Sequence, residues 1–399
     1  MTTTLTQATT QTSTQARPGF EQSPTARAPR PTTPYLELDV PAAVAKYEAL
    51  AAALPGTAVH YAVKANPHPR LLAELAAVGC RFDVASPEEV RSALRAGAEP
   101  ADLVYSNPVK RRDHIAEAAA MGVQLFVVDS LAETLKVAEA APGSRVLCRL
   151  VTSGEGSDWP LSRKYGCSSH ESVEILIAAH ELGLEAAGLS FHVGSQQNDP
   201  EAWAAPIAAA GRIFTALRNS GLDPTVLDLG GGFPAEYVEG CSPIEEYGEA
   251  VERHLLRAFG DRRPHTIVEP GRGIVGDAGT LVASVVAVIQ RGPVRWVFLD
   301  AGVFTGLVET LDEAIRYRLR TTADGGVTGP CVLAGPTCDS ADVLYEQQMV
   351  DLPVTLAEGD EVRLLSAGAY TSCYSSVGFN GFEPLPTTTR PTTTSSLQP

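Results

Sequence analysis

Short apolar stretches alternate with longer amphipathic ones through most of the chain, and this alternation predicts strands and helices in turn. The helical stretches are rich in Ala and Leu, for example AVAKYEALAAAL, PEEVRSALRAG and SLAETLKVAEAA. The predicted strands cover residues 57–63, 80–84, 103–105, 124–128, 145–150, 186–192, 225–229 and 266–269. About eight strand-then-helix units in succession favour a (β/α)8 TIM barrel. A doubly wound open sheet is the alternative, although no Gly-rich turn after the first strand suggests a dinucleotide site there.

The pattern changes near residue 279. Stretches such as TLVASVVAVIQ and DEVRLLSAGAY read as strands, and most of them are not separated by long helices. We therefore predict a barrel domain at 34–278 and a C-terminal, mainly β domain at 279–385. The strand-like segment within 34–40 precedes the barrel and is a candidate to join the β domain. Residues 1–33 and 386–399 are rich in Thr and Pro, and we predict that both are disordered tails.

Composition and charge narrow the function classes. The 399 residues carry a formal net charge of −16, which argues against a nucleic-acid partner. The seven cysteines are scattered without a CxxC pair, so neither a disulfide framework nor a metal site is expected. No apolar stretch is long enough to span a membrane, and MTTTLTQATTQTSTQ lacks the features of a secretory signal. These observations predict a cytoplasmic enzyme with no membrane partner.

Charged and polar residues stand at the ends of several predicted strands. In a TIM barrel, the C-terminal strand ends together form the site of chemistry. The residues at these ends are Lys64, Asp83, His192, the glycines 230–232, Glu269 and Arg272. Each has an ordinary structural explanation, such as a snorkelling lysine, a core histidine, a tight turn or a helix cap. Taken together, those explanations require several independent coincidences at one rim.

One ligand explains this set of side chains. The Lys64 amine can form a Schiff base with an aldehyde. Gly231 and Gly232 allow backbone N–H groups to approach a phosphate, and Arg272 adds a cation. The Glu269 carboxylate can keep a pyridine nitrogen protonated, and the imidazole at the sixth strand end can stack on a flat ring. These requirements describe pyridoxal 5′-phosphate.

Seven motifs occur in one order along residues 34–385: YAVKANP, DVAS, FHVGSQ, DLGGGFP, EPGRG, GPTCDSADVL and GAYTSCYSSVGFNGF. With these motifs the sequence resembles the fold-type-III pyridoxal-phosphate-dependent decarboxylases. This alanine-racemase-like barrel group includes ornithine, lysine and diaminopimelate decarboxylases, and the resemblance is strongest to bacterial ornithine decarboxylases. The resemblance implies a pyridoxal-phosphate enzyme that acts on a small amino acid.

The resemblance also implies roles for residues at matching positions. Lys64 would be the Schiff-base lysine, with Asp83 and Glu89 in the shell around it. His192 would stack on the cofactor ring, and Glu269 would pair with the pyridine nitrogen. The phosphate would be held by Ser195, Gly231, Gly232, Arg272 and Tyr370, with Pro270 and Gly271 placing the arginine.

The reaction expected from the resemblance is decarboxylation. Alanine racemases of this fold place an arginine against the pyridine nitrogen, so Glu269 favours loss of CO2. Family members form a head-to-tail homodimer with two shared sites, and we expect a homodimer here. Cys338 would return a proton to Cα from the partner subunit, and Asp339 would also act in trans. A small buried hydrophobe is the ordinary role of such a cysteine. A racemase and a non-catalytic regulatory paralogue are the rival classes.

The substrate is expected to end in an ammonium group, which needs an acidic partner when it is buried. Asp339 is one candidate, and Asp312 and Glu313 lie where ornithine decarboxylases carry their acidic substrate loop. The CDS sequence favours the ornithine/lysine branch over diaminopimelate enzymes, which usually carry CES. L-ornithine, giving putrescine and CO2, is therefore the first expectation, and lysine, a modified ornithine and then diaminopimelate are the alternatives. In WPLSRKYG, Pro160 replaces an arginine of the eukaryotic enzymes, and whether Arg163 substitutes for it stays open.

Overall fold

The computed structural model describes residues 31–160 and 164–390. The chain divides into two units, Met1–Thr32 and Thr33–Pro399, and everything below concerns the second unit. The predicted disorder of residues 1–33 therefore lies almost wholly outside the described residues, as does that of 391–399. Within the described residues no helix is long and apolar enough to cross a membrane.

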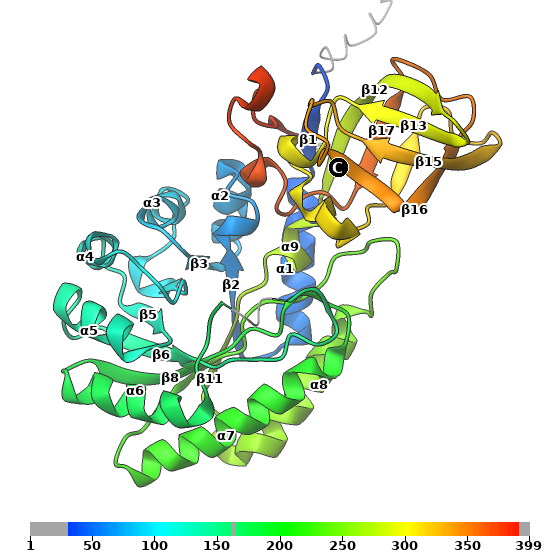
Figure 1. The fold of residues 1–399 in the computed structure, drawn as a ribbon. Coiled ribbons are helices and arrows are strands. Elements are labelled where there is room, and N and C mark those ends of the chain that lie inside the picture. Colours follow the sequence, from blue (N-terminus) through cyan, green and yellow to red (C-terminus); the bar gives the residue numbers. More distant parts are fainter. Residues whose placement is uncertain (1–30, 161–163, 391–399) are drawn as a thin grey trace, which may run out of the picture. The chain divides into compact units, whose positions relative to one another are not determined.

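Eight parallel strands close into a barrel, which confirms the predicted (β/α)8 fold (Figure 1). Each predicted barrel strand is present within one or two residues of its expected bounds. In spatial order the strands are β10 (Val226–Asp228), β11 (His265–Val268), β2 (Thr57–Ala62), β3 (Arg81–Val84), β4 (Leu103–Tyr105), β5 (Leu125–Val128), β6 (Arg145–Arg149) and β8 (Glu185–Ser190). The surrounding helices are α1 (Val40–Ala53), α2 (Pro69–Ala77), α3 (Pro87–Arg95), α4 (Arg112–Ala120), α5 (Leu131–Ala140), α6 (Ser169–Glu181), α7 (Ala204–Asn219) and α8 (Ile244–Phe259).

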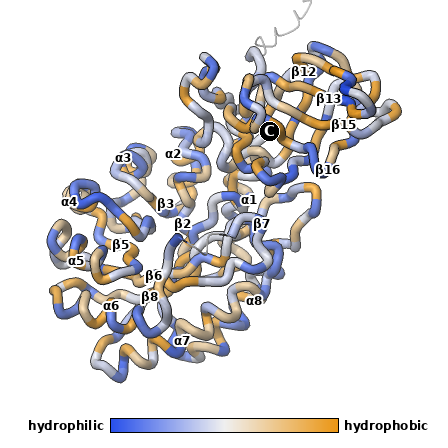
Figure 2. Tube along the Cα trace, viewed as in Figure 1, coloured by the Kyte–Doolittle hydropathy of each residue, from blue (hydrophilic) through white to orange (hydrophobic). Residues whose placement is uncertain are grey.

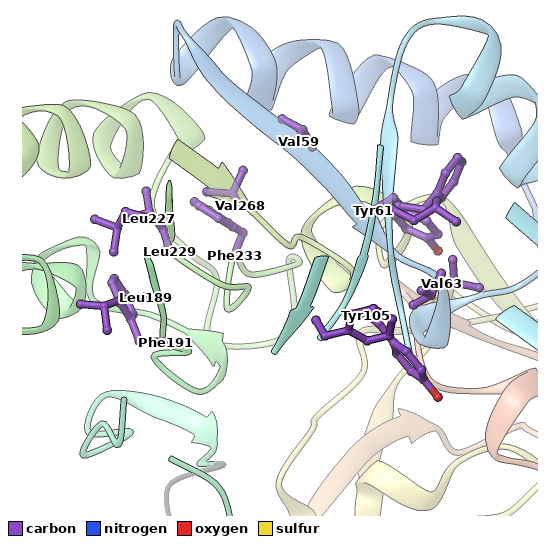
Figure 3. Close-up of a cluster of buried hydrophobic side chains, with 14 of the residues drawn as sticks. Val59, Tyr61, Val63, Tyr105, Leu189, Phe191, Leu227, Leu229, Phe233 and Val268 are labelled. Atoms are coloured by element: carbon purple, nitrogen blue, oxygen red, sulfur yellow. The ribbon is translucent and has the colours of Figure 1, made fainter. Parts of the chain in front are cut away.

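Side chains alternate between the two faces of each barrel strand, as strand geometry requires. On β2, Val59 and Tyr61 belong to the large core between strands and helices, whereas Ala58 packs inside the barrel. Figure 3 shows part of the large core, with Leu189 and Leu227 contributed by other strands. Hydrophobic and hydrophilic positions are mixed along the outer helices, as expected for helices with one face on a barrel (Figure 2). Burial on both faces fixes the register of the strands and therefore the place of their C-terminal ends.

A second, mixed sheet follows the barrel and begins at Gly279. Its strands in spatial order are β14 (Leu319–Thr321), β17 (Glu361–Leu365), β12 (Gly279–Arg291), β13 (Val294–Leu299), β15 (Thr328–Ala334) and β16 (Val343–Pro353). The N-terminal strand β1 (Tyr35–Leu38) pairs antiparallel with β12 and so belongs to this sheet. The sheet has its own core, with Val297, Leu333 and Leu364 completely buried.

The C-terminal tail begins later than its composition predicted. Strand β18 (Thr387–Thr389) lies inside the predicted tail 386–399 and pairs parallel with β1. Threonine is β-branched and suits a strand, and β18 pairs with the edge of β1 that β12 does not occupy. Arg390 also holds the segment, because its guanidinium lies 3.0 Å from Glu37 and 2.8 Å from Asp39. The prediction that disorder begins at residue 386 is therefore wrong for 387–389.

Candidate active site

A cavity of about 350 Å³ opens at the C-terminal ends of the barrel strands. Glu309, which follows β13, and Tyr370 and Tyr374, which follow β17, contribute part of its wall. Its lining residues are Lys64, Ala85, Ser106, Asn107, Pro108, Arg149, Trp159, Tyr165, His192, Ser195, Glu269, Glu309, Tyr370 and Tyr374. Five of the predicted site residues are among them: Lys64, His192, Ser195, Glu269 and Tyr370.

Lys64 stands in the 3-10 turn η1 (Val63–Ala65), directly after β2. Its Nζ lies 2.8 Å from the buried carboxylate of Asp83, which also accepts a hydrogen bond from the Ser106 hydroxyl. Burial opposes the positive charge of Lys64, but Asp83, followed by Tyr370 and Glu269, outweighs it, so the pKa of Lys64 is raised. The amine is therefore held protonated and in a fixed direction.

Glu89 begins the next shell around this pair. Its carboxylate accepts the backbone N–H of Ala85 at 2.7 Å, and burial raises its pKa to about 7. Ser86 caps helix α3 by accepting the Glu89 backbone N–H, which fixes the first turn of this helix beside the strand end.

Glu269 follows β11 and is almost fully buried. Within the described part of the chain its Oε1 has no hydrogen-bond partner. Burial, and then the Asp228 and Asp83 carboxylates, raise the pKa of Glu269 well above its usual range. The buried carboxyl therefore holds a proton more tightly than an exposed one, and it has a polar atom without a partner beside the cavity.

His192 stands two residues after the end of β8. Its Nδ1 accepts the backbone N–H of Gly194 at 3.0 Å. Burial, Arg149 and Lys64 all lower the pKa of His192 well below its usual range. The imidazole is therefore neutral, and its remaining proton is on Nε2.

Two of the predicted phosphate residues, Ser195 and Tyr370, lie beside Arg272, which begins the short helix α9 (Arg272–Val275). Its buried guanidinium lies 3.2–3.3 Å from the Ser195 hydroxyl. The ring of Tyr370 lies 5.0 Å from the guanidinium carbon. The Pro270 carbonyl accepts the backbone N–H of Ala62 at 3.1 Å, which ties this loop to β2.

The neighbouring glycines leave room that a side chain would fill. A Cβ at Gly231 would lie 2.6 Å from the Glu269 carbonyl oxygen. At Gly232, φ is +114° and a Cβ would lie 2.7 Å from a backbone oxygen. A Cβ at Gly271 would lie 3.1 Å from the Tyr370 hydroxyl. Backbone N–H groups can approach an anion closely only where such side chains are missing.

The predicted proton donor Cys338 and the three predicted substrate residues, which all come from the C-terminal domain, are not among the residues that line the cavity. Cys338 is exposed, and its backbone N–H donates to Asn380. The Asp339 carboxylate accepts the backbone N–H of Ala341, and Asp312 is exposed. The Glu313 carboxylate accepts backbone N–H groups from the segment 346–348 of β16. Of the two residues left open in WPLSRKYG, Pro160 is exposed and Arg163 lies outside the described residues.

Several lining residues were not predicted from the sequence. Arg149 ends strand β6, so the strand-end rule that selected Lys64 also indicates it. Its guanidinium stacks 5.5 Å from the Tyr165 ring. Glu309 and Tyr374 come from segments after the barrel, where the strand-end rule does not apply.

The residues present fit pyridoxal 5′-phosphate. The cavity offers an amine at Lys64 for an aldehyde and an unpartnered acid oxygen at Glu269 for a ring nitrogen. It also offers a neutral imidazole for a ring face. The glycine backbone beside Arg272 suits a phosphate.

The sequence and the structure were then compared with known proteins. The family described as "Pyridoxal-dependent decarboxylase, pyridoxal binding domain" matches residues 42–276. Lysine/ornithine decarboxylase of Selenomonas ruminantium is 35% identical over 361 residues, which cover 90% of each chain. A solved structure of SrLDC in complex with PLP and cadaverine superposes with a TM-score of 0.83 at 34% identity, covering 90% of this chain and 91% of that one. The lysine/ornithine decarboxylase of Vibrio vulnificus complexed with cadaverine gives 0.82 at 35% identity, with coverages of 90% and 94%.

Proposed function

We propose a substrate and residue roles from one premise: the chain belongs to the family of pyridoxal-dependent decarboxylases, carboxy-lyases whose cofactor is pyridoxal 5′-phosphate. The reaction is removal of CO2 from a basic amino acid. The substrate we propose is L-ornithine, which gives putrescine. L-lysine is the second candidate, because the relatives that carry both names are similar over nearly the whole chain.

The observation that carries the proposal is the presence of one amine and one buried acid in the same cavity. Lys64 supplies the amine, held by Asp83, and Glu269 supplies the acid, with one oxygen unpartnered. Pyridoxal 5′-phosphate, when bound, supplies an aldehyde carbon for amines and a ring that withdraws electrons from Cα. Lys64 would hold the cofactor at that carbon through its amine. Glu269 would face the ring nitrogen and share a proton with it through the oxygen that has no other partner.

Other side chains would orient the cofactor and neutralise its phosphate. His192 is neutral and would stack on the ring face without adding a positive charge beside Lys64. The phosphate is held by a larger group: Ser195, Tyr370, Arg272 and the backbone N–H groups of Gly231 and Gly232, with Pro270 and Gly271 fixing the loop. Asp83 and Glu89 form the shell that keeps Lys64 in place. The burial of Arg272 and Asp83 and the missing side chains at Gly231 and Gly232 support these proposed roles.

Return of a proton to Cα needs a donor beside the substrate. We assign this role to Cys338 of a partner subunit, so the working enzyme is a homodimer. Cys338 is exposed, as a residue that acts across an interface must be in a single chain. For the distal ammonium we propose Asp339 and the pair Asp312 and Glu313. Asp312 and Asp339 are both exposed. The cytoplasm is the compartment we propose, since scattered cysteines suit a reducing environment.

The test is CO2 release from L-ornithine, L-lysine, L-arginine and meso-diaminopimelate, measured side by side on the purified enzyme. We expect the highest kcat/KM with L-ornithine. A higher value with any of the other three would overturn the substrate assignment. Formation of D-ornithine without CO2 would instead support the racemase class, and no turnover of any substrate would support the regulatory class.

A further inference from the structure

A buried carboxylate shares the arginine at the proposed phosphate site. Glu309 stands in the 3-10 segment η6 (Val308–Glu313) and lines the cavity. Only 5% of its side chain and 2% of that of Arg272 are exposed. The two carboxylate oxygens accept from Arg272 NH2 at 2.6 Å and from NH1 at 2.9 Å. This is a two-pronged ion pair, the geometry that carboxylates and phosphates both prefer with arginine.

The five N–H groups of Arg272 all have an acceptor in the structure. The NH1–NH2 edge is occupied by Glu309, and NH1 also donates to the Tyr237 hydroxyl at 2.8 Å. The Nε–NH2 edge faces the Ser195 hydroxyl, at 3.3 and 3.2 Å. An incoming phosphate can therefore take the Ser195 edge, but it meets an arginine whose charge is already balanced.

Arg272 has other ties besides Glu309. The Tyr237 hydroxyl accepts one of its N–H groups, and the rings of Tyr370 and Tyr237 lie 5.0 and 5.8 Å from the guanidinium carbon. These contacts hold the guanidinium in place without a second charge. The distinctive contribution of Glu309 is therefore its negative charge, which lies beside a site meant for an anion.

We propose that Glu309 is a resident anion that competes with the cofactor phosphate for Arg272 and thereby limits the affinity of the enzyme for its cofactor. This inference rests on the proposed phosphate site. Glu309 acts through Arg272, so it is a positioning and charge-balancing residue. Without the charge of Glu309, the positive charge of Arg272 is fully available to the phosphate. Pyridoxal has no phosphate, so its affinity should not change.

The first experiment measures the Kd of pyridoxal 5′-phosphate and of pyridoxal for the cofactor-free enzyme by absorbance titration. E309Q should bind pyridoxal 5′-phosphate at least about threefold more tightly than the wild type. Its Kd for pyridoxal should stay within about twofold of the wild-type value, because that ligand has no charge at this site. E309D is the matched control, which keeps the charge and should restore the wild-type value. An unchanged or weaker affinity of E309Q for the phosphorylated ligand overturns the proposal, as does an equal gain for both ligands.

The second experiment uses inorganic phosphate alone and reads the Tm of the cofactor-free enzyme. Phosphate should raise the Tm of E309Q more than that of the wild type, and it should have the smallest effect on R272Q. If E309Q does not fold without the cofactor, the dissociation rate of the cofactor from its holoenzyme replaces this measurement, and it should be at least about threefold slower than in the wild type. An equal or faster rate overturns the proposal.

Failure of the proposed phosphate site and failure of the proposed role of Glu309 give different results. If R272Q binds both phosphorylated and unphosphorylated ligands like the wild type, the proposed phosphate site itself is wrong. If R272Q weakens only the phosphorylated ligand but E309Q does not strengthen it, the site stands and the role of Glu309 is wrong.

Discussion

Replacing Asp83 by Asn tests how the strand ends control the reactivity of Lys64. The two side chains lie 2.8 Å apart. At this separation the attraction between unit charges is about 1.5 kcal/mol in bulk water and about 6 kcal/mol at an effective dielectric constant of 20. Because 44% of the Lys64 side chain is exposed, solvent screens the pair, and a value near the lower limit, about 2 kcal/mol, is appropriate. Loss of that attraction lowers the pKa of Lys64 and raises the neutral fraction of its amine roughly 30-fold at fixed pH.

The assay follows acylation of the cofactor-free enzyme at pH 8 by a small amine-specific reagent, with the Lys64 peptide quantified by mass spectrometry. In D83N the rate at Lys64 should rise by more than about tenfold. Lys46, which pairs with Asp277 at the surface, is the internal reference and should keep its rate. D102N removes a surface partner of Arg81 and is the matched control. An unchanged rate at Lys64 in D83N would refute the reasoning, because Asp83 would then not determine the charge of the amine.

Three further predictions follow from buried groups. Burial raises the pKa of Asp228 to about 6, so the folded protein keeps a proton there that the unfolded chain releases, and stability falls as the pH rises from about 4 to 6. D228N should remove up to about 3 kcal/mol of that fall, as measured by urea unfolding across the window, and an equally steep fall would contradict it. K110M breaks a fully buried pair with Glu133 and should lower the free energy of unfolding by about 3–5 kcal/mol. This loss should be more than twice that of K136M, which removes a partly exposed partner of Glu133, and equal losses in the two variants would contradict the prediction. G231A places a Cβ 2.6 Å from the Glu269 carbonyl oxygen and should weaken cofactor binding at least about tenfold in an absorbance titration. Wild-type affinity of G231A would show that cofactor binding does not require glycine at this position.

The barrel and much of its rim could be predicted because both follow from local periodicity. Once alternating strands and helices indicate a parallel barrel, the residues after each strand must converge, and Lys64, His192 and Glu269 do so. Arg149 also ends a barrel strand, β6, so the same rule places it at the rim.

Other features depend on contacts between distant parts of the chain. Glu309 reaches the cavity only because the segment after β13 packs against Arg272, 37 residues away in sequence. Strand β18 forms only because β1, which is more than 300 residues earlier, offers its edge. Neither contact leaves a local pattern in hydrophobicity or turn residues, so sequence periodicity does not indicate it.

The central claim is that Lys64 is the residue that binds the cofactor covalently. The most direct test reduces the holoenzyme with borohydride, which makes the bond between the cofactor and its lysine permanent, and locates the added mass by peptide mass spectrometry. The structure predicts the label on Lys64 alone, with none on the buried Lys110, and no label in K64A. A label on Lys110 or any other lysine, or one that persists in K64A, would contradict the account.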